Sequence, residues 1–203
     1  MLPIKSKYRI AKRLGSAVFE QTQTQKFALS EARVKQRTRK GGRGGASDYN
    51  RQLLEKQRLR FTYGLKEREL SNYAKRAYTA TNPTQALHAA LEMRADSIVY
   101  RAGVASTRRA GRQMVSHGHI LVNGKRITTP SYNLKKGDVL TVREGSRTSP
   151  LFTRVEGEEA RRTAPQWLSH DAPNMKIEIL GEPTYSLTET PIDYSTVFEF
   201  YSR

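Results

Sequence analysis

The pattern of apolar and polar positions predicts two helices in the first half of the chain. Residues 49–63 and about 65–79 repeat apolar side chains every three or four positions, and Gly64 separates the two runs. Ser47 and Asp48 can cap the first run, because a short polar side chain accepts a hydrogen bond from a free backbone amide. Two helices joined by so short a turn predict an αα-hairpin.

Two shorter helices are predicted next. Asn82, Pro83 and Thr84 begin the first of them, because proline fits the first turn of a helix. Its inward positions are Leu87, Ala90 and Leu91. The second covers residues 94–102 and ends at Gly103.

A third pattern begins with an amphipathic helix. Ser106 or Thr107 can cap this helix, which then places apolar and polar residues on opposite sides. The apolar side holds Ala110, Gly111, Met114 and Val115. The polar side holds Arg108, Arg109, Arg112 and Ser116, so we expect three guanidinium groups to face outward.

The same stretch continues into strands. Residues 120–122 form an apolar run, and Asn123-Gly124 predicts a type I′ hairpin turn, because both residues tolerate the positive φ angles of that turn. Lys125-Arg126 begins the return strand. A further turn at Gly137-Asp138 precedes a closing strand at 139–142.

The C-terminal quarter has a weaker pattern. Residues 148–166 predict loop or weak helix, Trp167-Leu168 predicts an anchor in a core, and residues 169–195 predict a proline-containing segment that wraps the body. Residues 197–201 alternate with period two and predict a terminal strand or extended tail. Together the patterns predict an α+β fold, with a mainly helical body and an inserted αβ module of two helices and a small antiparallel sheet.

The first 46 residues are polar and basic, with little periodicity. Such a segment is expected to bury too little apolar area to order itself. It is either a disordered solubilising tail or an extension that orders on phosphate, where glycines let the backbone approach closely. On the second interpretation the contacts would come from Arg37, Arg39, Lys40 and Arg43.

The charge of the chain favours a polyanionic partner. The formal net charge is +17, which favours nucleic acid first and an anionic membrane second. The charge is also uneven: residues 1–93 carry 20 Lys or Arg and 7 Asp or Glu, whereas residues 148–203 carry 5 and 9. We therefore expect one face of the molecule to meet a polyanion and another to meet protein or solvent.

Several classes of protein are disfavoured. The chain has no cysteine, which excludes disulfides, thiolate metal sites and cysteine nucleophiles. No apolar run approaches the roughly 20 residues that cross a bilayer, so no membrane partner is expected. The basic, acid-free start is typical of an organellar transit peptide, but its basic character continues far beyond residue 15 and favours an attached RNA-binding arm.

The sequence offers little for catalysis. His117 and His119 could chelate a metal, but no carboxylate or thiol nearby completes a site. Residues 118–126 differ from a phosphate-binding loop in spacing, and Arg126 stands where a magnesium-binding Ser or Thr is needed. No nucleophile motif or carboxylate pair is present. We expect no enzyme, no metal, no cofactor and no small-molecule substrate.

Residues 96–143 resemble the S-four RNA-binding domain, which occurs in tyrosyl-tRNA synthetases, pseudouridine synthases and RNA-binding stress proteins. The matching residues are Asp96, Val99–Gly103, Ser106–Ala110, Arg112–Val115, Gly118, Val122–Lys125 and Gly137–Val139. The flanks resemble the small-subunit ribosomal protein S-four family. These matches are Arg13–Gly15, Ser47–Tyr49, Gln52-Leu53, Glu55–Gln57, Arg60, Tyr63-Gly64, Glu67-Arg68 and Phe200–Arg203.

The resemblance implies a domain order and a role. The expected parts are a basic extension (1–46), a helical rRNA-binding arm (47–93), the S-four domain (94–147) and a C-terminal segment that packs back on the helical body (148–203). The family implies direct binding of 16S-type rRNA, early assembly of the subunit body, contact with protein S-five, proximity to messenger RNA, and an influence on decoding accuracy. A cytoplasmic ribosome is expected, with an organellar one still open. The alternative is a non-ribosomal RNA-binding factor with the same module.

Carried over by matching position, the resemblance predicts RNA contacts in the arm and in the module. These are Ser47, Tyr49, Lys56, Gln57, Arg60 and Tyr63, then Ser106, Thr107, Arg108, Arg109, Arg112, His117, Asn123 and Lys125. Two departures from the family are visible. The N-terminal zinc cysteines of many bacterial relatives are absent, so no zinc is expected, and Ala95 stands where the family usually has Leu.

Overall fold

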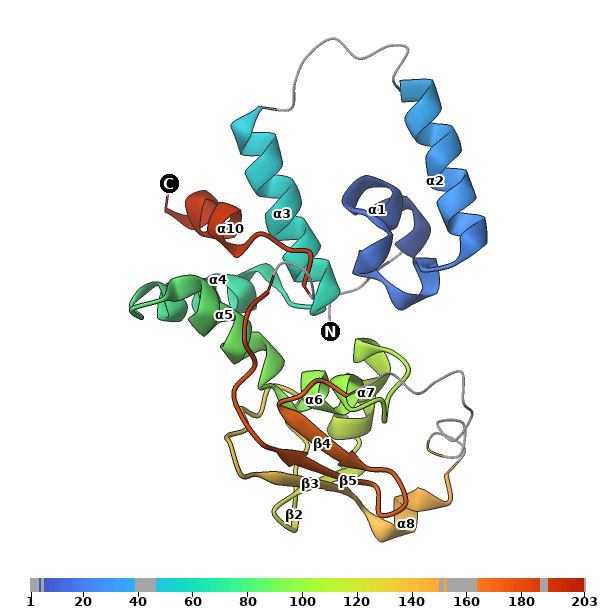
Figure 1. The fold of residues 1–203 in the computed structure, drawn as a ribbon, viewed down its shortest axis with the longest axis vertical. Coiled ribbons are helices and arrows are strands. Elements are labelled where there is room, and N and C mark those ends of the chain that lie inside the picture. Colours follow the sequence, from blue (N-terminus) through green and yellow to red (C-terminus); the bar gives the residue numbers. More distant parts are fainter. Residues whose placement is uncertain are drawn as a thin grey trace. The chain divides into compact units, whose positions relative to one another are not determined.

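The computed structural model describes residues 4, 6–38, 47–149, 152, 164–186 and 190–202 of the 203-residue chain. Two compact units make up the protein (Figure 1). Residues 1–84 and 186–203 form the helical unit, and residues 85–185 form the sheet unit. The described elements are mainly helices with one five-stranded antiparallel sheet, which confirms the predicted α+β class.

The helical unit begins with four short elements: α1 (Lys7–Leu14), η1 (Ser16–Val18), η2 (Glu20–Thr22) and α2 (Gln25–Thr38). The prediction that this region cannot order itself is therefore wrong for residues 6–38. Its apolar residues form a small core of Ala11, Leu14, Val18, Phe19 and Phe27. A turn at Gly15, with φ of 106°, separates Ala11 and Leu14 from Val18, Phe19 and Phe27. These apolar residues therefore do not form one periodic run in the sequence.

The predicted αα-hairpin is confirmed by α3 (Asp48–Thr62) and α4 (Glu67–Tyr78). The Ser47 hydroxyl caps α3 by accepting a hydrogen bond from the Asn50 amide at 3.4 Å. Gly64 makes the turn with φ of 62°, a left-handed conformation that glycine adopts without steric cost.

The end of the chain is a helix, α10 (Tyr194–Tyr201), so the predicted terminal strand or tail is wrong. The Asp193 carboxylate fixes its start by accepting hydrogen bonds from the amides of Ser195 (2.9 Å) and Thr196 (3.3 Å). Such a cap satisfies amides that have no partner within the helix and outweighs a period-two pattern over five residues. In the same unit α10 packs against α3 and α4.

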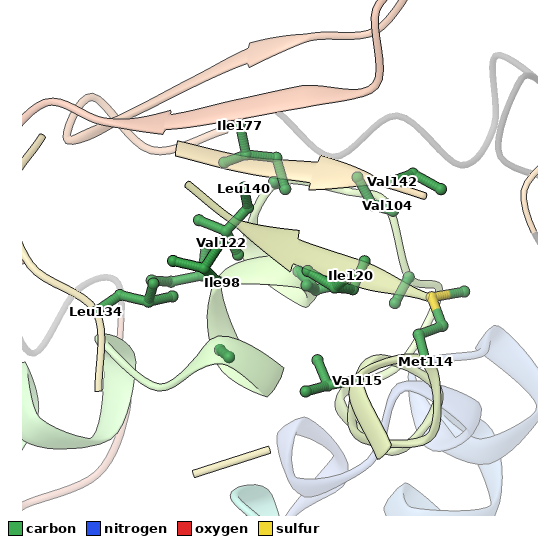
Figure 2. Close-up of a cluster of buried hydrophobic side chains, with 14 of the residues drawn as sticks. Ile98, Val104, Met114, Val115, Ile120, Val122, Leu134, Leu140, Val142 and Ile177 are labelled. Carbon is green, nitrogen blue, oxygen red and sulfur yellow. The ribbon is translucent and has the colours of Figure 1, made fainter. Parts of the chain in front are cut away.

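The sheet unit opens with three helices, α5 (Pro83–Glu92), α6 (Ala95–Arg101) and α7 (Arg108–Ser116), all close to their predicted positions. Thr107 caps α7, since its hydroxyl accepts a hydrogen bond from the Ala110 amide at 3.0 Å. Figure 2 shows α6 and α7 packed on the sheet through apolar side chains. The apolar side of α7 faces this core as predicted, with Gly111, Met114 and Val115 buried.

The sheet has the strand order β2-β1-β3-β5-β4. Its strands are β1 (Ile120–Val122), β2 (Lys125–Arg126), β3 (Val139–Val142), β4 (Leu168–Asp171) and β5 (Lys176–Ile179), and a short helix, α8 (Glu144–Arg147), follows β3. The predicted hairpin is confirmed: Asn123 and Gly124 have φ of 49° and 79°, and Val122 pairs with Lys125.

The hairpin of β4 and β5 differs from the wrapping segment that the sequence predicts. Leu140 in β3 pairs with Ile177 in β5, and Leu168 and Ile177 are buried in the sheet unit. The predicted boundary after residue 147 therefore differs from the structure: residues 164–185 complete the sheet unit, and the described residues after them belong to the helical unit. The anchor predicted at Trp167-Leu168 does lie at this core.

Candidate RNA-binding interface

The three arginines on the polar side of α7 differ in their exposure to solvent. Arg109 is exposed and Arg112 is half-buried on the outer side of the helix, one turn apart. Arg108 folds inward instead, and its side chain is 13% exposed. The expectation of three outward guanidinium groups is therefore wrong at Arg108, because a buried carboxylate holds that side chain.

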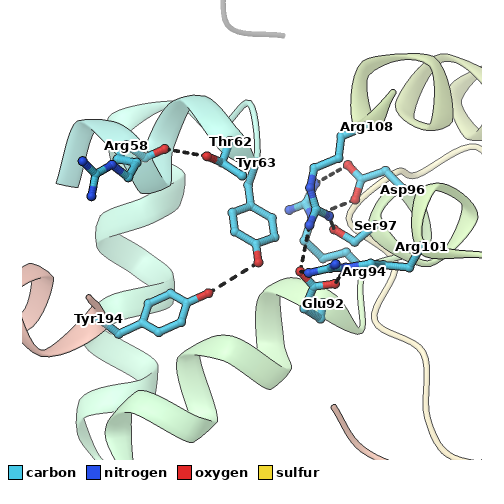
Figure 3. A network of polar contacts seen from close by, with 10 residues as sticks. All are labelled: Arg58, Thr62, Tyr63, Glu92, Arg94, Asp96, Ser97, Arg101, Arg108 and Tyr194. Carbon is cyan, nitrogen blue, oxygen red and sulfur yellow. Dashed lines mark hydrogen bonds and ion pairs between the residues drawn. The ribbon is translucent and has the colours of Figure 1, made fainter. Parts of the chain in front are cut away.

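That carboxylate belongs to Glu92, whose side chain is 1% exposed at the end of α5. Arg101 binds both of its oxygens, at 2.7 and 2.9 Å, and Arg108 binds one of them at 2.8 Å (Figure 3). Arg108 also donates to the Ser97 hydroxyl at 3.1 Å and lies 4.7 Å above the Tyr100 ring. This network, which we call the Glu92 network, joins α5, α6 and α7.

A second ion pair lies at the start of α6. Arg94 donates two hydrogen bonds to the Asp96 carboxylate, at 2.9 and 2.7 Å, and both side chains are buried (Figure 3). Two parallel bonds match the fork of a guanidinium to the two oxygens of a carboxylate and fix the geometry of both groups. In the sheet unit the buried carboxylates thus draw arginines inward and away from solvent.

The hairpin tip combines an internal brace with an exposed cation. The Asn123 side chain donates to the Asp138 carboxylate at 2.8 Å and accepts from the Val139 amide at 3.0 Å. These bonds hold the turn against β3, so the Asn123 amide has a structural role already in the free protein. Lys125 is exposed beside it, and Ser106 is exposed before α7.

Further basic side chains gather where α7 meets the sheet, and two of them, Arg126 and Arg143, were not among the predicted RNA contacts. His117, Arg126 and Arg143 are exposed around the half-buried His119. Burial and the positive charges of these three residues lower the pKa of His119 below its usual value. The spacing of 9 and 26 residues from His117 hides this cluster, because only the pairing of β1 with β2 and β3 brings it together.

In the helical unit the side chain of Lys56, a predicted RNA contact, binds to partners within the protein. Its side chain is 8% exposed, lies 2.9 Å from a Glu67 oxygen and sits 4.1 Å from the centre of the Phe200 ring. Tyr201 donates a hydrogen bond to the same Glu67 oxygen at 2.9 Å. Burial alone would raise the pKa of Glu67, but the bonds from Lys56 and Tyr201 outweigh it and hold this pKa below its usual value.

Tyr63 is also internal. Its hydroxyl lies 3.4 Å from the Tyr194 hydroxyl, and the ring is buried (Figure 3). Arg60 is partly buried and lies 3.8 Å from the Glu67 carboxylate, and it donates to the Gln57 side chain at 3.3 Å. By contrast Tyr49 is 50% exposed, although its ring centre is 5.9 Å from that of Phe200.

Part of the predicted set lies where no side chain can be placed. Arg39, Lys40 and Arg43 lie outside the described residues. Arg37 lies in α2, at a position where the side chain is not described. Their assignment as RNA contacts stays a prediction.

Among the described residues, none of the helices is long and apolar enough to span a membrane. Within the same part of the chain, no three His, Asp or Glu side chains are grouped so that they could hold a metal ion. His117 and His119 do lie close, with ring centres 5.9 Å apart, and the His119 Nδ1 is 2.9 Å from the Ser146 hydroxyl.

Comparison with known proteins identifies the family. The S4 domain matches residues 93–140, and the Ribosomal protein S4/S9 N-terminal domain matches residues 4–92. The small ribosomal subunit protein uS4 of a Sulfurihydrogenibium species is 38% identical over 196 residues, which cover 96% of this chain and 95% of that protein. The chain belongs to the uS4 family.

Other uS4 proteins are similarly close to this chain in sequence. That of Leuconostoc citreum is 39% identical over 201 residues, covering 97% of this chain and 96% of its own length. That of Persephonella marina is 42% identical over 158 residues, which are 77% of each chain. The resemblance to the S-four family is therefore confirmed, and the S4 domain coincides with α6, α7 and the first three strands of the sheet.

Proposed function

We propose that this chain is a structural constituent of the small ribosomal subunit that binds small-subunit rRNA directly and has no catalytic role. The observation that carries this proposal is the separation of charge in the sheet unit. The carboxylates of Glu92 and Asp96 are buried in ion pairs, whereas Arg109, Arg126 and Arg143 are exposed. These two acids are neutralised by internal arginines, and the exposed arginines of the same unit remain available to a polyanion. The names of the uS4 relatives supply the ribosomal context.

The binding would be mainly electrostatic. Each phosphate that a Lys or Arg neutralises releases condensed counterions, which gives a slope of roughly −0.7 to −0.9 per contact in log affinity against log salt. Double-helical RNA has a deep, narrow major groove that side chains cannot read. Recognition would therefore depend on the shape of the RNA, its phosphates and its 2′-hydroxyls.

We propose different roles for eight of the predicted contacts, according to the exposure of their side chains. We place phosphate contacts at exposed or partly exposed residues of the set: Tyr49, Arg109, Arg112, His117 and Lys125. We assign Lys56, Tyr63 and Arg108 to supporting roles, because each is buried or nearly buried against partners in its own unit. These three would position the elements that carry the contacts.

The finer roles rest on the family. A folded module that binds several RNA helices can fix their relative angles. In this way the protein would nucleate assembly of the subunit body and influence decoding accuracy. Protein S-five and messenger RNA are the further partners proposed on this basis. The ribosome would be that of the cytoplasm.

Sedimentation tests the proposal. A tagged copy of the full chain, expressed in cells, should move with the small subunit through a sucrose gradient in high salt. A direct test adds the purified chain to a small-subunit rRNA transcript in a filter-binding titration, where affinity should fall steeply with salt. Migration with free protein in the gradient, despite binding to RNA in the titration, would instead favour the non-ribosomal RNA-binding factor.

A further inference from the structure

The junction of α7 with the sheet brings four cationic or titratable side chains together. His117 directly follows α7, His119 precedes β1, Arg126 ends β2 and Arg143 follows β3. The Arg143 amide donates a hydrogen bond to the His119 carbonyl at 2.9 Å, which fixes the start of β1 beside the end of β3. Secondary structure therefore holds these residues in place, although they are distant in the sequence.

The Arg126 side chain lies against the backbone at Gly118. Gly118 has φ of 71° and lies two residues after the end of α7, and its amide donates a hydrogen bond to the Val115 carbonyl at 2.9 Å. A Cβ atom at this position would lie 2.2 Å from the Arg126 Nε, so any other residue would require the Arg126 side chain to move away. Arg126 lies there and donates to the His117 carbonyl at 3.2 Å.

The cluster has no anionic counterpart among the described ion pairs. Neither Arg126 nor Arg143 forms one with a described carboxylate, in contrast to Arg94, Arg101 and Arg108. The charges that act most on His119 are all positive. The nearest acid in sequence, Glu144, is exposed at the start of α8. Holding like charges together without a partner is unfavourable, and an anion would relieve it.

We propose that His117, Arg126 and Arg143, arranged around His119, form a phosphate-binding subsite for one or two backbone phosphates of RNA. Two exposed guanidinium groups, one at the end of β2 and one directly after β3, could each donate to phosphate oxygens, and the His117 ring could add a further donor. The Nδ1 of His119 is engaged by Ser146, so its Nε2 is the atom that remains for the anion. The subsite deepens the proposed function and rests on it.

Salt-dependent binding to a small-subunit rRNA transcript tests the subsite, with the full chain and two double variants. Arg126→Ala with Arg143→Ala removes two charges from the cluster. Lys135→Ala with Lys136→Ala removes two exposed charges before β3, at the opposite end of that strand. The cluster variant should bind at least ten-fold more weakly and lose roughly 1.4 to 1.8 from the salt slope, the value for two phosphate contacts. The lysine variant should lose less of both.

Equal losses in the two variants would show a general effect of net charge and overturn the subsite, as would wild-type affinity and slope in the cluster variant. Either result would leave the proposed function intact, because the wild-type chain would still bind rRNA. Failure of the wild-type chain to bind would overturn the proposed function itself.

A second measurement places the anion. Proton NMR of the full chain can follow the ring resonances of His117 and His119 while inorganic phosphate replaces chloride at constant ionic strength. A phosphate in the subsite should shift these resonances and raise the pKa of His119, and the cluster variant should lose both effects. Identical spectra in phosphate and chloride would contradict the proposed site.

Discussion

Each of the two units contains an ion pair between a carboxylate and one or more basic side chains. The base is the more buried member in the helical unit, and the acid is the more buried member in the sheet unit. In the helical unit the lysine is the buried member, with Lys56 8% exposed and Glu67 44% exposed. In the sheet unit the acid is buried, with Glu92 1% exposed and held by Arg101 and Arg108. Solvent screens the pair in the helical unit through its exposed carboxylate, so we expect loss of the acid's charge to cost less there than in the sheet unit, although it takes this partner from the buried Lys56.

The comparison explains which basic residues remain for a partner. In a chain of net charge +17, basic residues are abundant and acids are scarce. Each buried acid determines which neighbouring cations turn inward, and the rest are left on the surface. In the sheet unit the buried carboxylates of Glu92 and Asp96 thus remove three arginines from the proposed RNA-binding surface.

The largest expected effect comes from breaking the Glu92 network. Glu92→Gln leaves two arginine side chains without their buried counter-charge and should lower the stability of the sheet unit by about 3–5 kcal/mol. Fluorescence of the single tryptophan, Trp167, reports unfolding of this unit during a urea titration. The exposed Glu178→Gln is the matched control and should change the midpoint little. An unchanged midpoint for Glu92→Gln would remove the network from the account.

A smaller effect is expected where α10 contacts the start of α4 within the helical unit. Tyr201→Phe removes only the hydroxyl that bonds to Glu67 at 2.9 Å and should cost about 1 kcal/mol. Hydrogen exchange of α3 and α4 amides measures this loss. Tyr49→Phe, which removes an exposed hydroxyl, is the control. Equal protection in wild type and Tyr201→Phe would show that the bond does not stabilise the unit.

The smallest expected effect on stability comes from Glu67→Gln, and it depends on pH. Since the folded-state pKa of Glu67 is lowered, its contribution is present above the unfolded pKa and is lost as the pH falls through the folded pKa. The variant should therefore be less stable by under about 1 kcal/mol at pH 7 and should converge with wild type in acid. Thermal unfolding followed by circular dichroism from pH 7 downward checks this, and a constant difference would contradict it.

Much of the fold followed from the sequence because its signals are local. The α7 helix, its Thr107 cap and the Asn123-Gly124 hairpin depend on residues within a few positions of one another. The strand predicted for residues 197–201 failed because Asp193, a capping residue outside the pattern, decides the conformation. The hairpin of β4 and β5 was missed because the pairing of β5 with β3 that completes it joins residues distant in the sequence, and its turn uses Met175 with φ of 49°, a conformation that Met rarely adopts.

The site was less predictable than the fold. A helical wheel places Arg108 beside Arg109, and only the folded structure shows that Glu92, sixteen residues earlier, turns Arg108 inward. Arg126 and Arg143 were not predicted as RNA contacts, because only the pairing of strands brings the residues of their cluster together. Sequence can show which residues share a helix face, but it cannot show which cations the buried acids neutralise.

The central claim is that burial against an acid separates supporting cations from RNA-binding ones, and two neighbouring residues test it. Arg108→Gln and Arg109→Gln remove the same charge from adjacent positions of α7. Salt-dependent binding to a small-subunit rRNA transcript should weaken, with a shallower slope, for Arg109→Gln at unchanged stability. For Arg108→Gln the unfolding midpoint should fall while the slope stays that of wild type. A lost slope for Arg108→Gln with no effect at Arg109 would contradict the account.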